Sequence, residues 1–291
     1  IVVMDNELWK SKVGDKVREH FAASALGLTM DEPLFSIIQV PPNVFSGTVR
    51  NTRAVLYVQK DTLSLAHIKT DLYSKPQKVA VVKGTTEDQL IENLDSKAKE
   101  IISTFKDLEI GEAQNRFQRS LNKEKDIQDK FGIKLSIPSI YKVVKREENF
   151  IWVERQIQRG TMSIIAYEMP WDSFKVDSTF VKDIVRMRDS IGSLYIPGPD
   201  VPGKRTHMRT EPAFSPSVFP AEVAGRKAVE VRGLWDIKNY PMAGPFLTYI
   251  VNDQEHNRKM VVEGFTFAPA TEKRDYMFEL EAIIKTLRIN K

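Results

Sequence analysis

The chain has no cysteine, which excludes disulfide bonds, thiolate catalysis and cysteine-ligated zinc. It also has no apolar run approaching the ~20 residues that a membrane-spanning helix requires. Histidine is scarce, and no histidine lies three or four positions from another, so a helical pair of metal ligands is not available; the histidines are His20, His67, His207 and His256. We therefore expect no cofactor and no transmembrane segment.

Neither sign of charge dominates. The 43 Lys and Arg residues face 39 Asp and Glu residues, and the two signs are interspersed along the chain. Nucleic-acid binding needs a clustered basic face, so we predict no nucleic-acid partner. The acidic pairs Asp31-Glu32 and Glu147-Glu148 are interpreted as solvated turn charges, because adjacent side chains point apart.

One motif has the glycine and lysine spacing of a phosphate-binding P-loop, Gly-Pro-Asp-Val-Pro-Gly-Lys-Arg-Thr from Gly198 to Thr206. Arg205 occupies the position of the hydroxyl that would reach Mg²⁺, two prolines remove amide donors, and no helix is predicted after the motif. We interpret it as a proline-stiffened loop. No Gly-x-Ser-x-Gly elbow supports a serine hydrolase, so a triad dispersed over the chain is kept only as an alternative.

The composition, 42% hydrophobic and 28% charged, is typical of a globular protein, and 291 residues are enough for two domains. Residues 1–110 predict an N-terminal α+β domain. Thr86 and Gln89 form a capping-box pattern there, ahead of a helix whose apolar positions are Leu90, Leu94, Ala98, Ile101 and Phe105. The charged segment 111–131 predicts an exposed connecting helix that ends before Gly132.

Residues 132–291 predict a C-terminal α+β sandwich domain. Its expected elements are strands near 133–137, 141–145, 150–158 and 162–168, a helix over 180–191, strands over 228–235, 246–252 and 259–267, and a last helix that ends near Leu287. The segment 196–220 is rich in proline and predicts a long irregular loop. The fold class is α+β, with mostly antiparallel sheets packed against helices.

The candidate binding residues are mostly basic. Lys204, Arg205, His207 and Arg209 gather in the proline-rich loop, and Trp171 follows Pro170 in another loop. Such cations bind phosphates and carboxylates, and a loop tryptophan can line a pocket. We therefore consider a pocket for an anionic glycan or lipid fragment here. The other interpretation is that these are solvated loop charges.

Several strings resemble an uncharacterised lipoprotein family of Bacteroidetes (domain of unknown function 4837). They are the opening Val-Val-Met-Asp-Asn-Glu-Leu-Trp, Tyr195-Ile-Pro-Gly-Pro, Gly233-Leu-Trp with Gly244-Pro-Phe, and Phe267-Ala-Pro with Arg274-Asp-Tyr. The resemblance implies an export signal and a lipid-modified cysteine upstream of Ile1, hence a lipid-anchored protein that is periplasmic or surface-exposed. It brings no known activity. The second half is also similar in architecture to PsbP and Mog1 sandwiches, which are mostly accessory or binding proteins.

These observations together favour a non-catalytic accessory or scaffold protein of the cell envelope. Its expected partners are envelope or outer-membrane proteins, bound through residues 196–220 or through a sheet surface. A ligand-binding module for an anionic glycan or lipid fragment and a hydrolase with a dispersed triad remain the alternatives.

Overall fold

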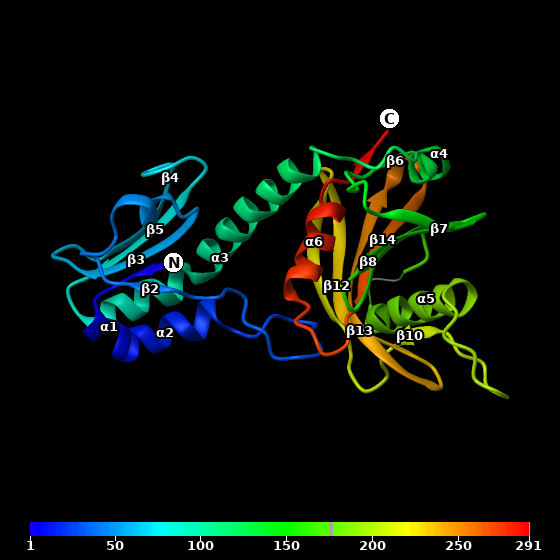
Figure 1. Cartoon of the computed structure of the whole chain (residues 1–291), viewed down its shortest axis with the longest axis horizontal. Coiled ribbons are helices and arrows are strands. Elements are labelled where there is room, and N and C mark those ends of the chain that lie inside the picture. Colours follow the sequence, from blue (N-terminus) through cyan, green and yellow to red (C-terminus); the bar gives the residue numbers. More distant parts are fainter. Residues whose placement is uncertain (175–176, 291) are drawn as a thin grey trace. The chain divides into compact units, whose positions relative to one another are not determined.

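The structure of the protein is a computed structural model that describes residues 1–174 and 177–290 (Figure 1). The chain divides into two compact units. The first unit comprises Ile1–Ala25 and Pro33–Glu112, and the second comprises Leu26–Glu32 and Ala113–Lys291. The α+β class is confirmed in both units. None of the helices among the described residues is long and apolar enough to cross a membrane.

The first unit is a five-stranded sheet in the order β2-β1-β3-β5-β4, with the α-helices on one face and the short η1 on the other. Its strands are β1 (Val2–Val3), β2 (Gln39–Val40), β3 (Ala54–Lys60), β4 (Leu65–Thr70) and β5 (Lys78–Gly84). Its helices are α1 (Asn6–Lys10), α2 (Lys12–Phe21), α3 (Glu87–Phe117) and the short η1 (Gly47–Asn51). Only the pair β4–β5 is antiparallel among its strand pairs.

The helix predicted after Thr86 is confirmed, and its apolar stripe is buried against the sheet. All five apolar positions named above are buried, and four of them lie in the main core of the first unit: Leu90, Leu94, Ile101 and Phe105. The Thr86 hydroxyl accepts a hydrogen bond from the Gln89 amide, while the Gln89 side chain accepts one from the Thr85 amide. The predicted capping residues therefore satisfy free amides at the helix start, although the second contact falls one residue earlier.

The prediction of a single connecting helix over residues 111–131 is wrong. Helix α3 continues from the first unit to Phe117, and a separate helix, α4 (Asp126–Phe131), follows after a non-helical segment. The Asn122 amide donates to the Ile137 carbonyl and its side chain donates to the Tyr141 carbonyl. These contacts with a later part of the chain replace helical hydrogen bonds. Gly132 ends α4 in the left-handed conformation, as predicted.

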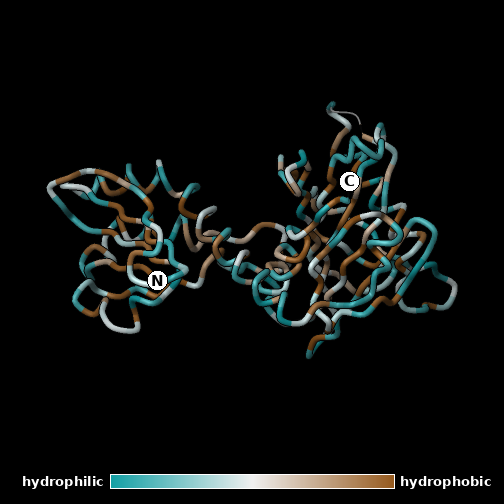
Figure 2. Tube along the Cα trace, turned by 90° about the horizontal axis from the view of Figure 1, so that it is seen from above, coloured by the Kyte–Doolittle hydropathy of each residue, from teal (hydrophilic) through white to brown (hydrophobic). Residues whose placement is uncertain are grey.

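The second unit is built on an eight-stranded antiparallel sheet in the order β10-β12-β13-β14-β9-β8-β7, with β11 also paired to β12. The strands are β7 (Lys142–Glu147), β8 (Phe150–Ile157), β9 (Gly160–Pro170), β10 (Met208–Thr210), β11 (Ser217–Val223), β12 (Arg226–Ile237), β13 (Tyr240–Asp253) and β14 (Arg258–Phe267). Two further strands, β6 (Ile133–Lys134) and β15 (Arg288–Ile289), pair with each other. In Figure 2 brown, hydrophobic stretches run through much of the second unit.

One helix packs on each face of the large sheet. Helix α5 (Phe180–Tyr195) covers one face, where Ile184, Met187 and Ile191 join the main core. Helix α6 (Arg274–Ile284) packs on the other face, where a Cβ added to Gly264 of β14 would lie 2.8 Å from the Leu280 Cβ. The last helix thus ends at Ile284, three residues before the predicted Leu287, which is also buried.

A charged pair lies inside the core under α5. The Arg188 Nη2 atom donates to Glu263 Oε1 of β14 at 2.8 Å, and the two side chains are 4% and 1% exposed. Thr248 donates to the same carboxylate, and the Arg188 guanidinium lies 3.8 Å from the centre of the Phe246 ring. The pair therefore fixes α5 on the sheet through directional contacts.

The prediction of an irregular loop over residues 196–220 is wrong in part, because the segment contains β10 and the first part of β11. Pro212 and Pro216 lie between the two strands, and Pro220 lies within β11. Among the described strands β11 pairs only with β12, and an edge strand tolerates proline where the missing N–H would face outward. Proline content alone therefore did not exclude an edge strand.

The interpretation of Glu32 as a solvated turn charge is wrong. The Glu32 side chain is buried in the second unit. Its carboxylate accepts hydrogen bonds from the backbone amides of Lys273 and Arg274 at 2.7–3.0 Å. These amides begin α6 and have no partner within the helix. A carboxylate at this position also suits the helix dipole, so Glu32 stabilises the start of α6.

Candidate functional site

The basic motif at 198–206 forms a short ordered projection between α5 and β10, which we call the finger and define as residues 197–207. Pro197 bridges to His207 and Val201 bridges to Lys204. The Lys204 amide donates to the Val201 carbonyl at 3.0 Å, and the Gly203 φ of +68° allows the tight turn between them. No helix follows the motif, so its P-loop spacing does not build a phosphate cradle.

Two contacts hold the base of the finger. Arg205 donates to the carbonyl and the hydroxyl of Ser193, both at 3.0 Å, and the Asn239 side chain donates to the Arg205 carbonyl at 3.0 Å. The residues next to these anchors are exposed hydrophobic side chains, Leu194 at 64% and Tyr240 at 39%. Each anchor of the finger thus has an exposed apolar residue next to it in the sequence.

The finger carries cations without acidic partners. Lys204 and Arg205 are exposed on it, Lys238 is exposed beside it, and none of the three forms an ion pair within the described ranges 1–174 and 177–290. Arg209 differs, because its guanidinium binds Asp236 through two hydrogen bonds of 2.8 and 3.0 Å. Asp200 is the one acidic residue of the finger. The surface there is therefore predominantly basic.

The pKa of His207 is sensitive to these neighbouring positive charges. Its Nδ1 atom is buried, with no hydrogen-bond partner in the described part of the chain. Burial lowers the pKa of His207, and the nearby cations Arg205, Lys238 and Arg209 lower it further. The imidazole is therefore held neutral at pH values where an ordinary histidine begins to take up a proton.

This field can be tested by titration. Replacing Arg205 and Lys238 with glutamine should raise the pKa of His207 toward its ordinary value, because two of the repelling charges are gone. The measurement is an NMR titration of the His207 ring in the variant and in the unaltered protein. An unchanged pKa would mean that Arg205 and Lys238 do not contribute to the lowered value.

The structure separates Trp171 from the basic residues, so the single pocket considered for them is wrong. Trp171 follows Pro170, which pairs with Arg258 where β14 begins, opposite Asp253 of β13. Asp236, the partner of Arg209, lies opposite Ala243 near the other end of β13. Asp253 comes ten residues after Ala243, which is about 34 Å at roughly 3.4 Å per residue. The Trp171 ring instead lies 4.4 Å from the Lys259 ammonium.

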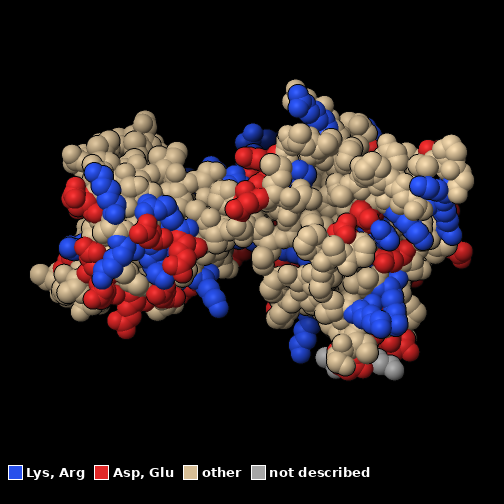
Figure 3. Space-filling view, turned by 90° about the horizontal axis from the view of Figure 1, so that it is seen from below, with Lys and Arg blue, Asp and Glu red and all other residues tan. Residues whose placement is uncertain are grey.

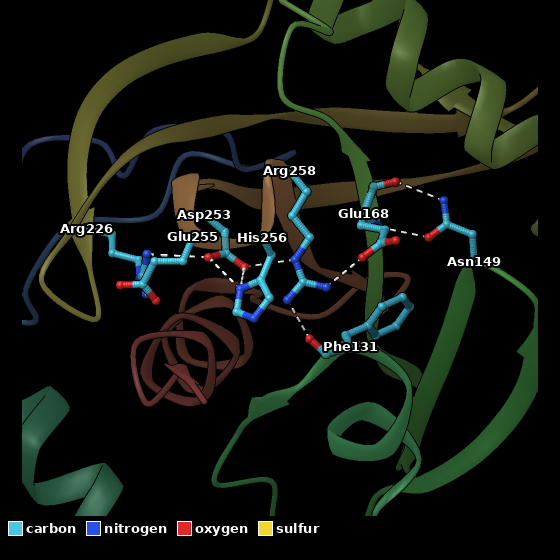
Figure 4. Close-up of polar contacts among 8 residues, drawn as sticks. All are labelled: Phe131, Asn149, Glu168, Arg226, Asp253, Glu255, His256 and Arg258. Atoms are coloured by element: carbon cyan, nitrogen blue, oxygen red, sulfur yellow. Dashed lines mark hydrogen bonds and ion pairs between the residues drawn. The ribbon is translucent and has the colours of Figure 1, made fainter. Parts of the chain in front are cut away.

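A second cluster of polar side chains surrounds Asp253 at the tip of the β13–β14 hairpin (Figure 4). Asp253 is fully buried and contacts His256 Nδ1 at 2.9 Å, Arg258 Nε at 2.8 Å and Arg226 Nη1 at 3.4 Å. Arg258 also donates to Glu168 and to the Phe131 carbonyl, both at 2.6 Å. This cluster therefore ties the hairpin to β9 and to the end of α4.

The geometry of this cluster raises two chemical possibilities, and neither fits. Ligand atoms of Asp253, Glu255 and His256 lie within 4.8 Å of one another, but Arg226 and Arg258 already neutralise the carboxylates, and their charges oppose a divalent cation. His256 paired with Asp253 also resembles two members of a catalytic triad. The buried carboxylate is shared with the two arginines, so its contacts serve the hairpin rather than one imidazole. We assign the cluster a structural role.

The sequence predicted His256 as an exposed turn residue, which is correct, but it did not reveal the buried carboxylate beside it. Asp253 looked like another polar residue of the hairpin tip, and its arginine partners come from three-dimensional proximity. One feature of the sequence could have indicated the contact between Asp253 and His256. The two residues are three positions apart, as neighbours on a helical turn are, and the short η2 (Gln254–His256) lies there.

Comparisons with known proteins give a family but no activity. A family model described as a domain of unknown function (DUF4837) matches residues 120–286, and a second, also described as a domain of unknown function (DUF8532), matches residues 1–118. The two matches meet just after α3. No curated protein matches the chain. The likeness to PsbP and Mog1 proteins stays a prediction.

One similar solved structure is the crystal structure of LpqN, which is involved in cell envelope biogenesis of Mycobacterium tuberculosis. It is 14% identical, and the match covers 55% of this chain and 83% of LpqN. The TM-score is 0.31, so this likeness supports no conclusion about the present chain.

Proposed function

The chain belongs to the DUF4837 family of domains of unknown function, and we propose that it is a non-catalytic accessory protein of the cell envelope that binds an acidic partner protein through the finger. The observation that carries this proposal is the set of three exposed cations at the finger, Lys204, Arg205 and Lys238, which have no acidic partner within the described residues. Oppositely charged surfaces attract and orient protein partners. The envelope location rests on the sequence resemblance given above.

The shape of the finger favours a protein over a small molecule. Small ligands are held in concave sites that bury most of their surface, whereas the finger projects between α5 and β10. Exposed Leu194 and Tyr240 lie next to its anchors. Interfaces commonly combine such apolar contacts with a polar rim, so an acidic protein surface with an apolar centre fits this region.

Basic and acidic side chains are both present on the face that Figure 3 shows. Lysine and arginine there lie among aspartate and glutamate over both units. An acidic partner drawn by overall charge alone would find opposing charges on that face, since the net charge is only +4. The finger therefore offers such a partner a local group of cations that the small net charge alone would not provide.

A pull-down from native membranes in gentle detergent tests the proposal. The double variant Lys204→Glu/Lys238→Glu keeps the Arg205 anchors and should recover at least about tenfold less partner, which corresponds to a loss of ~1.4 kcal/mol of binding free energy. The matched control Lys182→Glu/Lys227→Glu also reverses two exposed lysines, away from the finger, and should behave like the unaltered protein. Recovery of a monomer alone, or equal recovery with both variants, would refute the proposal.

A further inference from the structure

A pocket of about 550 Å³ lies in the second unit beside α4. The segment before α4, the helix itself, β6 and the adjoining parts of β7 and β8 line it. This volume is in the range of small-molecule sites. The pocket lies outside the finger, and the proposed function does not use it.

The floor of the pocket is apolar. Ile127, Ile133, Ile137 and Val153 border it but are buried, so the apolar surface open to a ligand comes mainly from the half-buried Leu121, Leu135 and Val143. An aliphatic group that replaces water over these side chains gains roughly 25 cal/mol per Å² of apolar surface removed from water. The floor therefore suits a hydrocarbon chain.

The rim of the pocket is basic. Lys123, Lys125 and Lys134 line it, are exposed, and make no ion pair or side-chain hydrogen bond in the described part of the chain. The acidic residues of the lining, Glu124 and Asp126, are both occupied by Arg146. Three lysines without partners thus stand over an apolar floor.

The wall that carries two of these lysines is fixed at both ends. Arg146 holds Asp126 at the start of α4, and Arg258 Nη2 donates to the Phe131 carbonyl at its end, at 2.6 Å. The Asn122 contacts with Ile137 and Tyr141 hold the preceding segment. Because the wall is ordered without a ligand, little conformational entropy is lost when one binds.

We propose that this pocket binds a single-chain anionic amphiphile, with its aliphatic chain on Leu121, Leu135 and Val143 and its carboxylate or phosphate head at Lys123, Lys125 and Lys134. A purely ionic ligand would leave the apolar floor in contact with water, so it fits the pocket less well. A cationic amphiphile is disfavoured because the unpaired lysines repel it. A neutral amphiphile would leave the lysines without counter-charges. The combination therefore specifies both parts of the ligand.

Calorimetric titration of the full chain with dodecanoate and with dodecyl phosphate, below their micelle concentrations, tests this inference and distinguishes the two heads. At least one of them should bind, and dodecyltrimethylammonium and inorganic phosphate should each bind at least tenfold more weakly. The triple variant Lys123→Glu/Lys125→Glu/Lys134→Glu should weaken the anionic amphiphile at least thirtyfold. The finger variant Lys204→Glu/Lys238→Glu should bind it unchanged.

The apolar floor has its own variant. Val143→Phe fills part of the pocket without changing its charge and should weaken the anionic amphiphile at least tenfold, with an unchanged circular-dichroism spectrum as the check on folding. Equal binding of the cationic amphiphile, unchanged binding by the triple variant, or inorganic phosphate binding as tightly as dodecyl phosphate would each overturn the inference. A loss of partner pull-down with the finger variant does not bear on it.

Discussion

Replacing Arg188 with leucine should lower the free energy of unfolding by about 3–5 kcal/mol. The substitution leaves Glu263 buried at 1% side-chain exposure without its cation. It also removes the Arg188 contact with Thr210 and the packing of the guanidinium on Phe246. Denaturant unfolding followed by tryptophan fluorescence measures this, because Trp152, Trp171 and Trp235 all lie in the second unit.

The double variant Arg188→Met/Glu263→Leu is the control for this prediction. Hydrophobic residues that replace both members of a buried ion pair are often tolerated, since no uncompensated charge remains. The double variant should therefore be more stable than Arg188→Leu alone. If Arg188→Leu changes the free energy of unfolding by less than about 1 kcal/mol, the pair does not hold α5 on the sheet.

Replacing Asp253 with alanine should lower the free energy of unfolding by about 3 kcal/mol, because Arg226 then loses its buried counter-charge and His256 loses its hydrogen-bond partner. Arg258 keeps Glu168 and the Phe131 carbonyl, so the loss falls at the lower end expected for a broken buried pair. Glu255→Gln is the matched control, because Glu255 is 58% exposed in its ion pair with Arg226, and the expected change is below about 1 kcal/mol.

The contribution of Asp253 to the free energy of unfolding should also depend on pH. Burial raises the pKa of Asp253, but hydrogen bonds from His256 and Arg258 outweigh it, so the folded carboxyl has a lowered pKa. A lowered carboxyl pKa contributes stability that is fully present above the ordinary value and is lost as the pH falls through the folded pKa. The Asp253→Asn variant should therefore lose less stability than the unaltered protein between pH 6 and pH 2, and equal losses would contradict this assignment.

Local patterns predicted the elements that depend on local contacts. The stripe from Leu90 to Phe105 predicted α3, because burial repeats at helical spacing. Elements that depend on distant partners were missed. Ile133 was placed in the main series of strands, yet β6 pairs with β15 near the other end of the second unit's sequence. Edge pairing likewise formed β11 in spite of Pro220.

In the candidate site, too, features that depend on neighbouring residues were predicted and those that depend on distant partners were missed. The cluster of Lys204, Arg205, His207 and Arg209 was visible in the sequence, because its members are close neighbours. Their different roles were not, since Arg209 is neutralised by Asp236 of β12 and Arg205 contacts Ser193 of α5. Trp171 was grouped with them by residue type, and only the strand register shows that it lies at the other end of the sheet. Glu32 was assigned to solvent because its partners, the amides that begin α6, are distant in sequence.

Site-specific photo-crosslinking tests most directly the proposal that the finger is a protein-binding surface. A photoreactive amino acid is placed at Pro202 in the finger turn, and in a second protein at Lys99, an exposed position on α3 of the first unit. Irradiation of intact cells should join a discrete second polypeptide to the Pro202 protein and not to the Lys99 protein, and Lys204→Glu/Lys238→Glu should abolish the product. The absence of a product at Pro202, or the same product at both positions, would contradict the proposal.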